Sequence, residues 1–401
     1  MTADNVRARA AIEGLRSGVP SRHAVAQLGT TQTEIKSAFD EAIEGLQAGA
    51  AVKPLVISAN FGSGKTHLLE YLQALAEERN FAVSYLVVSP EMPLGSAPKV
   101  LQALSESSRA PGRIGKALRS LGSERARPEA FQEVRAWCSA VGLHERFLAL
   151  LHLYCEFSSD PEFRAQILGD IEGKPLLRTV LNQKLKEIGT HGSYDLKGAS
   201  STAVLAPQRI RLFAQLIRAC GVHGTVVLFD ELERMAQFSK KQRLAAYEQL
   251  GWWAGLAARP GSGILPVFAM TSSFVNTCVL PDEASGILLA LDERDRQAQE
   301  GVRLLKGNLR LIDPSQSEIE SVRYRIKALY EEAYQLAVPD FRDDYYEGST
   351  PIRQRIRRWI TQWDLHRFFP DQKLQLVVDE LRFDSNVISD QELAQDPDQD
   401  D

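Results

Sequence analysis

The chain has 401 residues, of which 44% are apolar and 25% are charged, and its formal net charge is −5. These values are ordinary for globular proteins, so they exclude collagen-like, intrinsically disordered and disulfide-scaffold proteins. The length predicts two or three packed units rather than a single core.

The negative charge is concentrated at the end of the chain. Residues 386–401 contain six acidic residues and no basic one, so the net charge without them is −5 + 6 = +1. Because this tail lacks apolar anchors, we expect it to be disordered. Charge alone neither indicates nor excludes nucleic-acid binding, and a DNA site would have to be a local patch.

The four cysteines form no CxxC pair and the seven histidines form no HxxxH pair. The sequence therefore gives no support for a disulfide framework or for a His/Cys metal site. It contains no run of 18 apolar residues, and polar residues follow Met1. These features predict a soluble, cytoplasmic protein that does not contact a membrane.

Residues 1–50 are expected to be a helical segment, because apolar residues recur at helical spacing on both sides of a break at Gly18–Pro20. Ser21 and either Thr30 or Thr31 are candidate helix caps. Two short helices and a turn could form a helix-turn-helix DNA reader. Packing against the next domain is the preferred interpretation.

The period of the apolar pattern changes at residue 54. Four short apolar runs predict buried strands: Leu55–Ile57, Phe81–Val88, Thr225–Phe229 and Val267–Met270. The helical segments between them indicate an α/β domain over residues 51–312 with a mostly parallel sheet. Pro266 lacks an N–H group, so the fourth strand is predicted to start after it.

Two further helical regions accompany this domain. Residues 98–205 are too long for a simple connection, and residues 128–188 show helical periodicity, which indicates a helical insertion. Apolar residues again recur every three or four positions after residue 313. Residues 313–385 are therefore predicted to form a helical lid domain.

A glycine-rich loop follows the first predicted strand and opens a helix, as a phosphate-binding loop requires. Its backbone N–H groups would face phosphates, Lys65 would reach the β and γ phosphates of ATP, and the Thr66 hydroxyl would bind Mg²⁺. The first position of the usual pattern is Ala59 rather than Gly; a simple turn is the alternative. The residues predicted to contact the nucleotide are Ala59, Asn60, Phe61, Gly62, Ser63, Gly64, Lys65, Thr66 and His67.

Two carboxylates, Asp230 and Glu231, follow the third predicted strand. Ligands of parallel α/β sheets bind at this end of the strands, and buried carboxylates there need a cation. Asp230 is thus predicted to hold Mg²⁺ and Glu231 to polarise the attacking water; alternatively Asp230 only caps the next helix. Glu233 is expected to be at the surface or salt-bridged.

The fourth predicted strand ends in polar residues. Thr271 and Ser272 are candidates to sense the γ phosphate and to orient water, and a simple strand-end turn is the alternative.

Together these motifs resemble the AAA+ P-loop ATPases related to origin-recognition initiators, with Gly62–Thr66 as the Walker A motif and Asp230-Glu231 as the Walker B motif. Segments 14–20, 61–69, 89–95 and 351–365 resemble the BrxD group of ATPases from the BREX phage-defence system. The resemblance implies an AAA+ core, ATP and Mg²⁺ as cofactors and other defence proteins as partners, with DNA and further copies of the chain in a homo-oligomer as additional candidate partners.

The resemblance also implies arginines at the γ phosphate. Arg353 matches the lid sensor position, although the lid arginines could equally form a solvated or DNA-facing surface. Arg355 and Arg358 are expected on a second basic face of the same helix. Arg294 and Arg296 are candidates for the arginine that a neighbouring subunit contributes, but their alternating charges also suit an exposed helix.

The function predicted from the sequence is ATP hydrolysis coupled to a conformational change in a defence complex. A slow nucleotide-dependent switch or scaffold is one alternative. A replication initiator or helicase loader is another; it is less favoured, because residues 386–401 after the predicted lid are expected to be too few and too acidic for the winged DNA-binding domain that those initiators usually add.

Overall fold

The structure, a computed structural model, describes residues 3–17, 22–60, 62–122, 128–196, 202–286, 293–340 and 350–370. Within these ranges, five strands form one sheet in the order β2-β3-β4-β1-β5, and all neighbouring strands pair in parallel. The strands are β1 (Leu55–Ala59), β2 (Ala82–Val87), β3 (Thr225–Asp230), β4 (Ile264–Thr271) and β5 (Leu309–Arg310). The predicted α/β fold with a parallel sheet is confirmed.

Two details of the sheet differ from the prediction. β4 begins at Ile264, so Pro266 lies inside it and is in register with Val227 of β3. β1 pairs with β4 only from Val267 onward, so Pro266 precedes the ladder with β1. β5 was not predicted, because a strand of two residues has no periodicity to detect.

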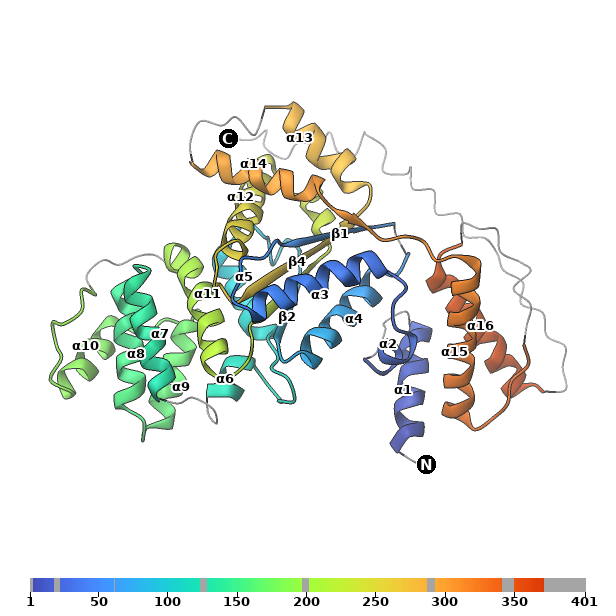
Figure 1. The fold of residues 1–401 in the computed structure, drawn as a ribbon, viewed down its shortest axis with the longest axis horizontal. Coiled ribbons are helices and arrows are strands. Elements are labelled where there is room, and N and C mark those ends of the chain that lie inside the picture. Colours follow the sequence, from blue (N-terminus) through green and yellow to red (C-terminus); the bar gives the residue numbers. More distant parts are fainter. Residues whose placement is uncertain are drawn as a thin grey trace, which may run out of the picture.

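Helices cover both faces of the sheet, giving the three-layer arrangement of an α/β domain (Figure 1). α3 (Thr33–Gln47) and α4 (Lys65–Glu78) pack on the face that includes Ile57 and Leu228. The opposite face, which includes Val56 and Phe229, is covered by α5 (Ala97–Ser107), α11 (Thr202–Ala219) and α12 (Lys240–Ala257), and α14 (Glu293–Lys306) packs on α12. Three short helical elements complete this part: η1 (Leu232–Gln237), η2 (Val275–Val279) and α13 (Leu280–Ala284).

A helical lobe lies at one end of the molecule, where the insertion was predicted (Figure 1). It consists of α6 (Ala117–Gly122), α7 (Pro128–Ala140), α8 (Glu145–Glu156), α9 (Pro161–Ile171) and α10 (Arg178–Glu187). Its buried side chains join the core on the α11 side of the sheet.

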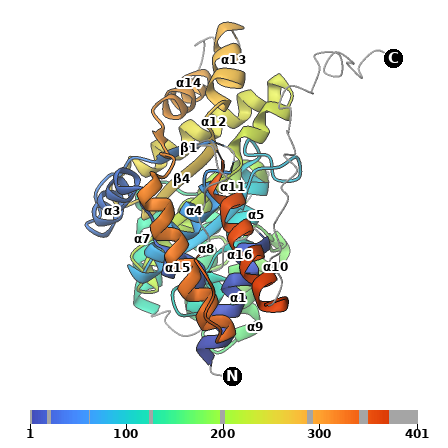
Figure 2. The same ribbon diagram turned by 90° about the vertical axis from the view of Figure 1, so that its right-hand side faces the viewer.

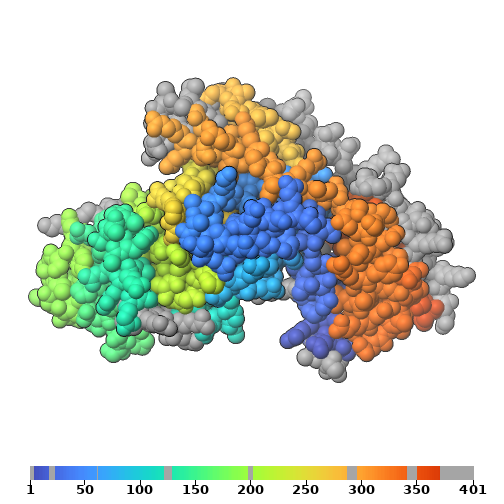
Figure 3. All heavy atoms as spheres, in the orientation of Figure 1, coloured from blue at the N-terminus to red at the C-terminus, as the bar shows by residue number. Residues whose placement is uncertain are grey.

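α15 (Gln316–Tyr334) and α16 (Ile352–Phe368), the helices of the predicted lid, lie at the other end of the molecule (Figures 1 and 2). They share a separate core with α1 (Ala3–Ser17) and α2 (Arg22–Leu28), and Figure 3 shows the N-terminal residues directly against the lid. The predicted packing against the next domain holds for α2, which contacts α4, whereas α1 packs on α15 and α16. α3, by contrast, packs on the sheet.

Some predictions cannot be compared with the structure. The break at Gly18–Pro20, Phe61 and the acidic tail at 386–401 lie outside the described residues. Among the helices of the described ranges, none combines the length and apolar character that a membrane span requires.

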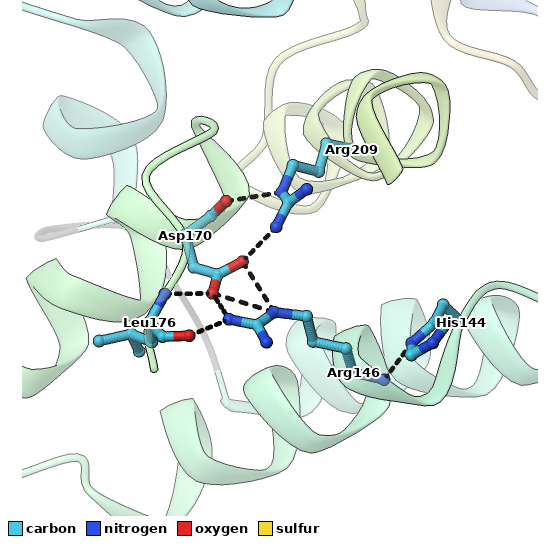
Figure 4. Close-up of polar contacts among 5 residues, drawn as sticks. All are labelled: His144, Arg146, Asp170, Leu176 and Arg209. Carbon is cyan, nitrogen blue, oxygen red and sulfur yellow. Dashed lines mark hydrogen bonds and ion pairs between the residues drawn. The ribbon is translucent and has the colours of Figure 1, made fainter. Parts of the chain in front are cut away.

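A buried ion-pair cluster joins the insertion to the ATPase-like core. Asp170 of α9 is fully buried and pairs with Arg146 of α8 and Arg209 of α11 (Figure 4). Arg209 Nη2 donates to Asp170 Oδ1 at 2.9 Å, and the Leu176 backbone N–H donates to Asp170 Oδ2 at 2.8 Å. One carboxylate thus pairs with two guanidinium groups and links three helices.

Asp170→Ala should lower the free energy of unfolding by about 3–5 kcal/mol, because Arg209 would remain as an uncompensated buried charge. Urea denaturation of the full chain measures this change. Asp4→Asn, which removes an exposed ion pair with Arg7, serves as the control and should leave the midpoint nearly unchanged. An Asp170→Ala midpoint equal to that of the control would contradict a structural role for the cluster.

Candidate functional site

The glycine-rich loop connects the end of β1 to the start of α4. Gly62 (φ +78°) and Gly64 (φ +103°) have left-handed backbone conformations, which side chains with a Cβ rarely adopt. These conformations let the loop turn so that α4 begins directly at Lys65. The N-terminus of α4 consequently faces the loop, as it does in phosphate-binding sites.

Lys65 lies against two carboxylates at the end of β3. Its Nζ is 2.9 Å from Glu233 Oε1 and 3.3 Å from Asp230 Oδ1. The structure thus brings together the loop lysine and the predicted metal ligand. Thr66 follows Lys65 in the first turn of α4.

Asp230 is almost fully buried and is held by further hydrogen bonds. Tyr85 of β2 donates its hydroxyl to Asp230 Oδ2 at 2.7 Å, and the Glu231 backbone N–H donates to Asp230 Oδ1 at 2.7 Å. Burial, followed by the Asp230 charge, raises the pKa of Tyr85, so the phenol keeps its proton. Tyr85 is not among the residues predicted from the sequence, since a tyrosine inside a strand is an ordinary β-forming residue.

Glu231 and Glu233 have different surroundings. Glu231 adopts a left-handed backbone (φ +61°), and its carboxylate pairs with Arg234 one turn later. Glu233, expected at the surface or in a salt bridge, is salt-bridged to Lys65, and it also accepts a hydrogen bond from the Thr271 backbone N–H at 3.1 Å. Glu233 is therefore part of the site.

The polar end of β4 lies beside the glycine-rich loop. The Ser272 hydroxyl donates to Asn60 Oδ1 at 2.5 Å, and its backbone N–H donates to the Ala59 carbonyl at 3.0 Å. The Thr271 hydroxyl lies 3.4 Å from the Ser273 hydroxyl. Of the two candidates, it is Ser272 whose side chain contacts the loop.

A cavity of about 140 Å³ adjoins the loop and is enclosed by three parts of the chain that are distant in sequence. Its walls come from the connection after α2, from the loop and α4, and from the segment that leads into the lid together with the lid helices. The lining residues are Leu15, Leu28, Gly29, Thr30, Thr31, Gln32, Ser63, Gly64, His67, Leu68, Leu311, Pro314, Val322, Ile352, Arg353 and Ile356. The residues of the α2 connection had appeared in the sequence only as candidate helix caps.

The lid meets the glycine-rich loop at the start of α16. A Cβ on Gly62 would lie 3.1 Å from Pro351 Cβ, so the two segments are in close contact. Arg353, the predicted sensor, is exposed and lines the cavity. Arg353 thus lines the same cavity as Ser63 and Gly64 of the glycine-rich loop.

The prediction that Arg355 lies on a second basic face of α16 is wrong, because the Arg355 side chain is buried. Arg355 precedes Trp359 and Trp363 at intervals of four, which places it on the face that packs into the lid core. Its Nε donates to the Thr350 carbonyl at 3.2 Å.

Of the two candidate subunit-contact arginines, Arg296 is exposed on α14, whereas the Arg294 side chain lies outside the described part.

His67 closes the cavity on the α4 side. Its Nε2 donates to the Gly29 carbonyl at 2.8 Å, which connects α4 to the turn after α2. Burial lowers the pKa of His67 below its ordinary value of 6.5, and the hydrogen bond to Gly29 offsets only part of this effect. The neutral imidazole is thus the form that the folded protein favours.

Comparison with known families fits this geometry. The family described as BREX system ATP-binding protein BrxC/D matches residues 4–118 and 201–348. The chain belongs to this family. The match omits residues 119–200, which include α7–α10 of the insertion. As a member of the BrxC/D family, the chain is an ATP-binding protein of a BREX system. Searches of curated proteins and of solved structures find no match.

The neutral state of His67 predicts a pH dependence of stability. As the pH falls below about 6.5, the unfolded chain binds a proton at this imidazole before the folded chain does. The free energy of unfolding should therefore decrease with falling pH, and His67→Gln should remove part of this decrease. Urea midpoints at about pH 8 and about pH 5.5 measure the effect.

His191→Gln provides the matched control, since His191 is exposed. This variant should show the same pH dependence as the wild type. If His67→Gln also does so, His67 is not the group responsible.

Proposed function

We propose that the chain binds ATP with Mg²⁺ at the glycine-rich loop and hydrolyses it as a component of a BREX defence complex. The observation that carries the proposal is the position of Lys65, which begins α4 and faces Asp230 at the end of β3. A lysine at a helix start opposite a buried strand-end carboxylate is the arrangement that phosphates and a divalent cation require. Membership of an ATP-binding family supports the same nucleotide.

Each part of ATP has a matching part of the site. The cavity beside Gly64 and His67 has apolar walls from Leu28, Leu68 and Ile352, which suit the base and ribose. The backbone of the loop and Lys65 would hold the phosphates. Arg353, on the cavity wall, would contact the γ phosphate from the lid.

The chemistry of the donor set fits Mg²⁺. Asp230 offers a buried carboxylate and Thr66 a hydroxyl, both hard oxygen ligands of the kind that Mg²⁺ prefers. The ion would neutralise charge on the β and γ phosphates. Tyr85 would orient the Asp230 carboxylate, and Ser272 would fix Asn60 of the loop.

Glu231 is the residue proposed to polarise the attacking water, with Thr271 at the neighbouring strand end. Its carboxylate pairs with Arg234, and this pair would have to open for Glu231 to reach the water. This pairing also favours the second candidate function, a slow switch that holds ATP and recruits partners. The rate of turnover separates the two: a switch would retain ATP for many minutes.

The proposed partners are other BREX proteins, and DNA is the proposed target of the complex. Direct DNA contact by the lid arginines has reduced support, because Arg355 is buried and Arg357 Nη2 donates to the Ser17 carbonyl at 2.7 Å. In a homo-oligomer, a neighbouring subunit would contribute Arg296 to the ATP site. ATP turnover measured with and without duplex DNA addresses the DNA question.

Glu231→Gln should keep ATP binding and lower hydrolysis by about 10²–10⁴-fold, because the amide preserves shape but loses the charge that polarises water. Single-turnover hydrolysis gives the rate, and calorimetric titration gives the affinity.

Lys65→Ala tests ATP binding at the same site. It should lose most of the affinity for ATP while remaining folded, since it removes the charge that faces the phosphates. Wild-type affinity in folded Lys65→Ala would contradict ATP binding at this loop. Wild-type hydrolysis by Glu231→Gln would exclude Glu231 as the catalytic carboxylate.

A further inference from the structure

Lys65 has an internal anionic partner in the position that the proposed function assigns to phosphate. Glu233 Oε1 lies 2.9 Å from Lys65 Nζ, closer than Asp230 Oδ1 at 3.3 Å. The Lys65 side chain is 14% exposed and that of Glu233 is 26% exposed, so the pair is partly shielded from water. An ion pair in such surroundings is stronger than one on the open surface.

The second oxygen of Glu233 is also used. Glu233 Oε2 accepts the hydrogen bond from the Thr271 backbone N–H at 3.1 Å. The carboxylate therefore bridges the start of α4 and the end of β4, although it comes from η1 after β3. An anionic oxygen held by a lysine ammonium and a backbone N–H has the donor environment that a phosphate oxygen would have.

We propose that Glu233 is an affinity-determining residue that occupies the phosphate contact of Lys65 and has to leave it when a nucleotide binds. This inference rests on the proposed function, because it concerns the phosphates of the same ligand. A phosphate that reaches Lys65 must break the Glu233 ion pair and then lies near a second negative charge. Glu233 thereby weakens nucleotide binding.

The displacement also releases the Thr271 backbone N–H. Because Thr271 ends β4, phosphate binding at Lys65 changes a contact at the neighbouring strand end, where the proposed water-orienting residues lie. Glu233 is thus a positioning residue for the start of α4 and the end of β4, and it does not itself take part in the chemical step.

The test is a calorimetric titration of the full-length chain with Mg·ATP, using Glu233→Gln. This substitution keeps the size and the hydrogen-bonding oxygen but removes the charge. We expect the affinity for ATP to increase at least about tenfold, because the charged Glu233 carboxylate no longer competes with phosphate for Lys65. Purely structural damage would weaken binding, so a gain in affinity distinguishes the proposal from such a role.

Two further variants keep the result interpretable. Glu233→Asp retains the charge on a shorter side chain and should bind ATP with an affinity between those of the wild type and Glu233→Gln. Glu187→Gln removes a carboxylate that pairs with Lys184 in the insertion and should leave ATP affinity unchanged. Thermal unfolding of each variant confirms that it is folded.

The outcomes separate this inference from the proposed function. If the wild type binds ATP and Glu233→Gln binds with equal or lower affinity, the inference is overturned and the proposed function stands. If neither protein binds ATP, the proposed function fails, and the inference fails with it. Detectable binding by Glu233→Gln alone would support both.

Discussion

The arrangement of the site depends on neutralising one partly buried cation. Lys65 is fixed at the first position of α4 by a loop that only glycines can form, and its ammonium group has to find anions nearby. In the described structure the anions are Asp230 and Glu233, both supplied by the segment that leaves β3. The start of α4 and the ends of β3 and β4 are consequently connected through polar contacts.

A second constraint is that the two ends of the chain build one core. α1 and α2 have apolar faces that the sheet does not cover, and the lid helices α15 and α16 cover them instead. The Arg16 guanidinium of α1 also donates to Asp364 of α16 at 2.7 Å, which reinforces this contact. The cavity beside the loop lies where this terminal core meets the sheet domain, so movement of the lid would change its walls.

Much of the fold could be predicted from the sequence because local patterns determine it. Short apolar runs gave β1–β4, and the glycine-rich loop after β1 located the start of α4. The two-residue strand β5 and the inclusion of Pro266 in β4 depend on neighbouring strands, so local patterns could not predict them. Arg355 was misplaced because its spacing to Arg358 was considered, whereas its spacing of four to Trp359 determines its burial.

In the site too, local patterns predict some residues, whereas contacts between distant parts of the chain determine others. Motifs identified Lys65 and Asp230, which the structure brings within 3.3 Å. The contacts of Tyr85 and Glu233 join residues far apart in the chain, and no spacing rule connects them. The wall formed after α2 was missed for the same reason, since it faces the cavity only when the terminal core has assembled.

The central claim is that ATP binds where the loop, the α2 connection and the lid enclose the cavity. Hydrogen–deuterium exchange of the full chain with and without Mg·ATP tests it most directly. The account predicts slower exchange in residues 28–32, 62–68 and 352–356 together, with no change in the insertion helices α7–α10. Slower exchange confined to the insertion, or no change in any of the three cavity segments at saturating ATP, would contradict it.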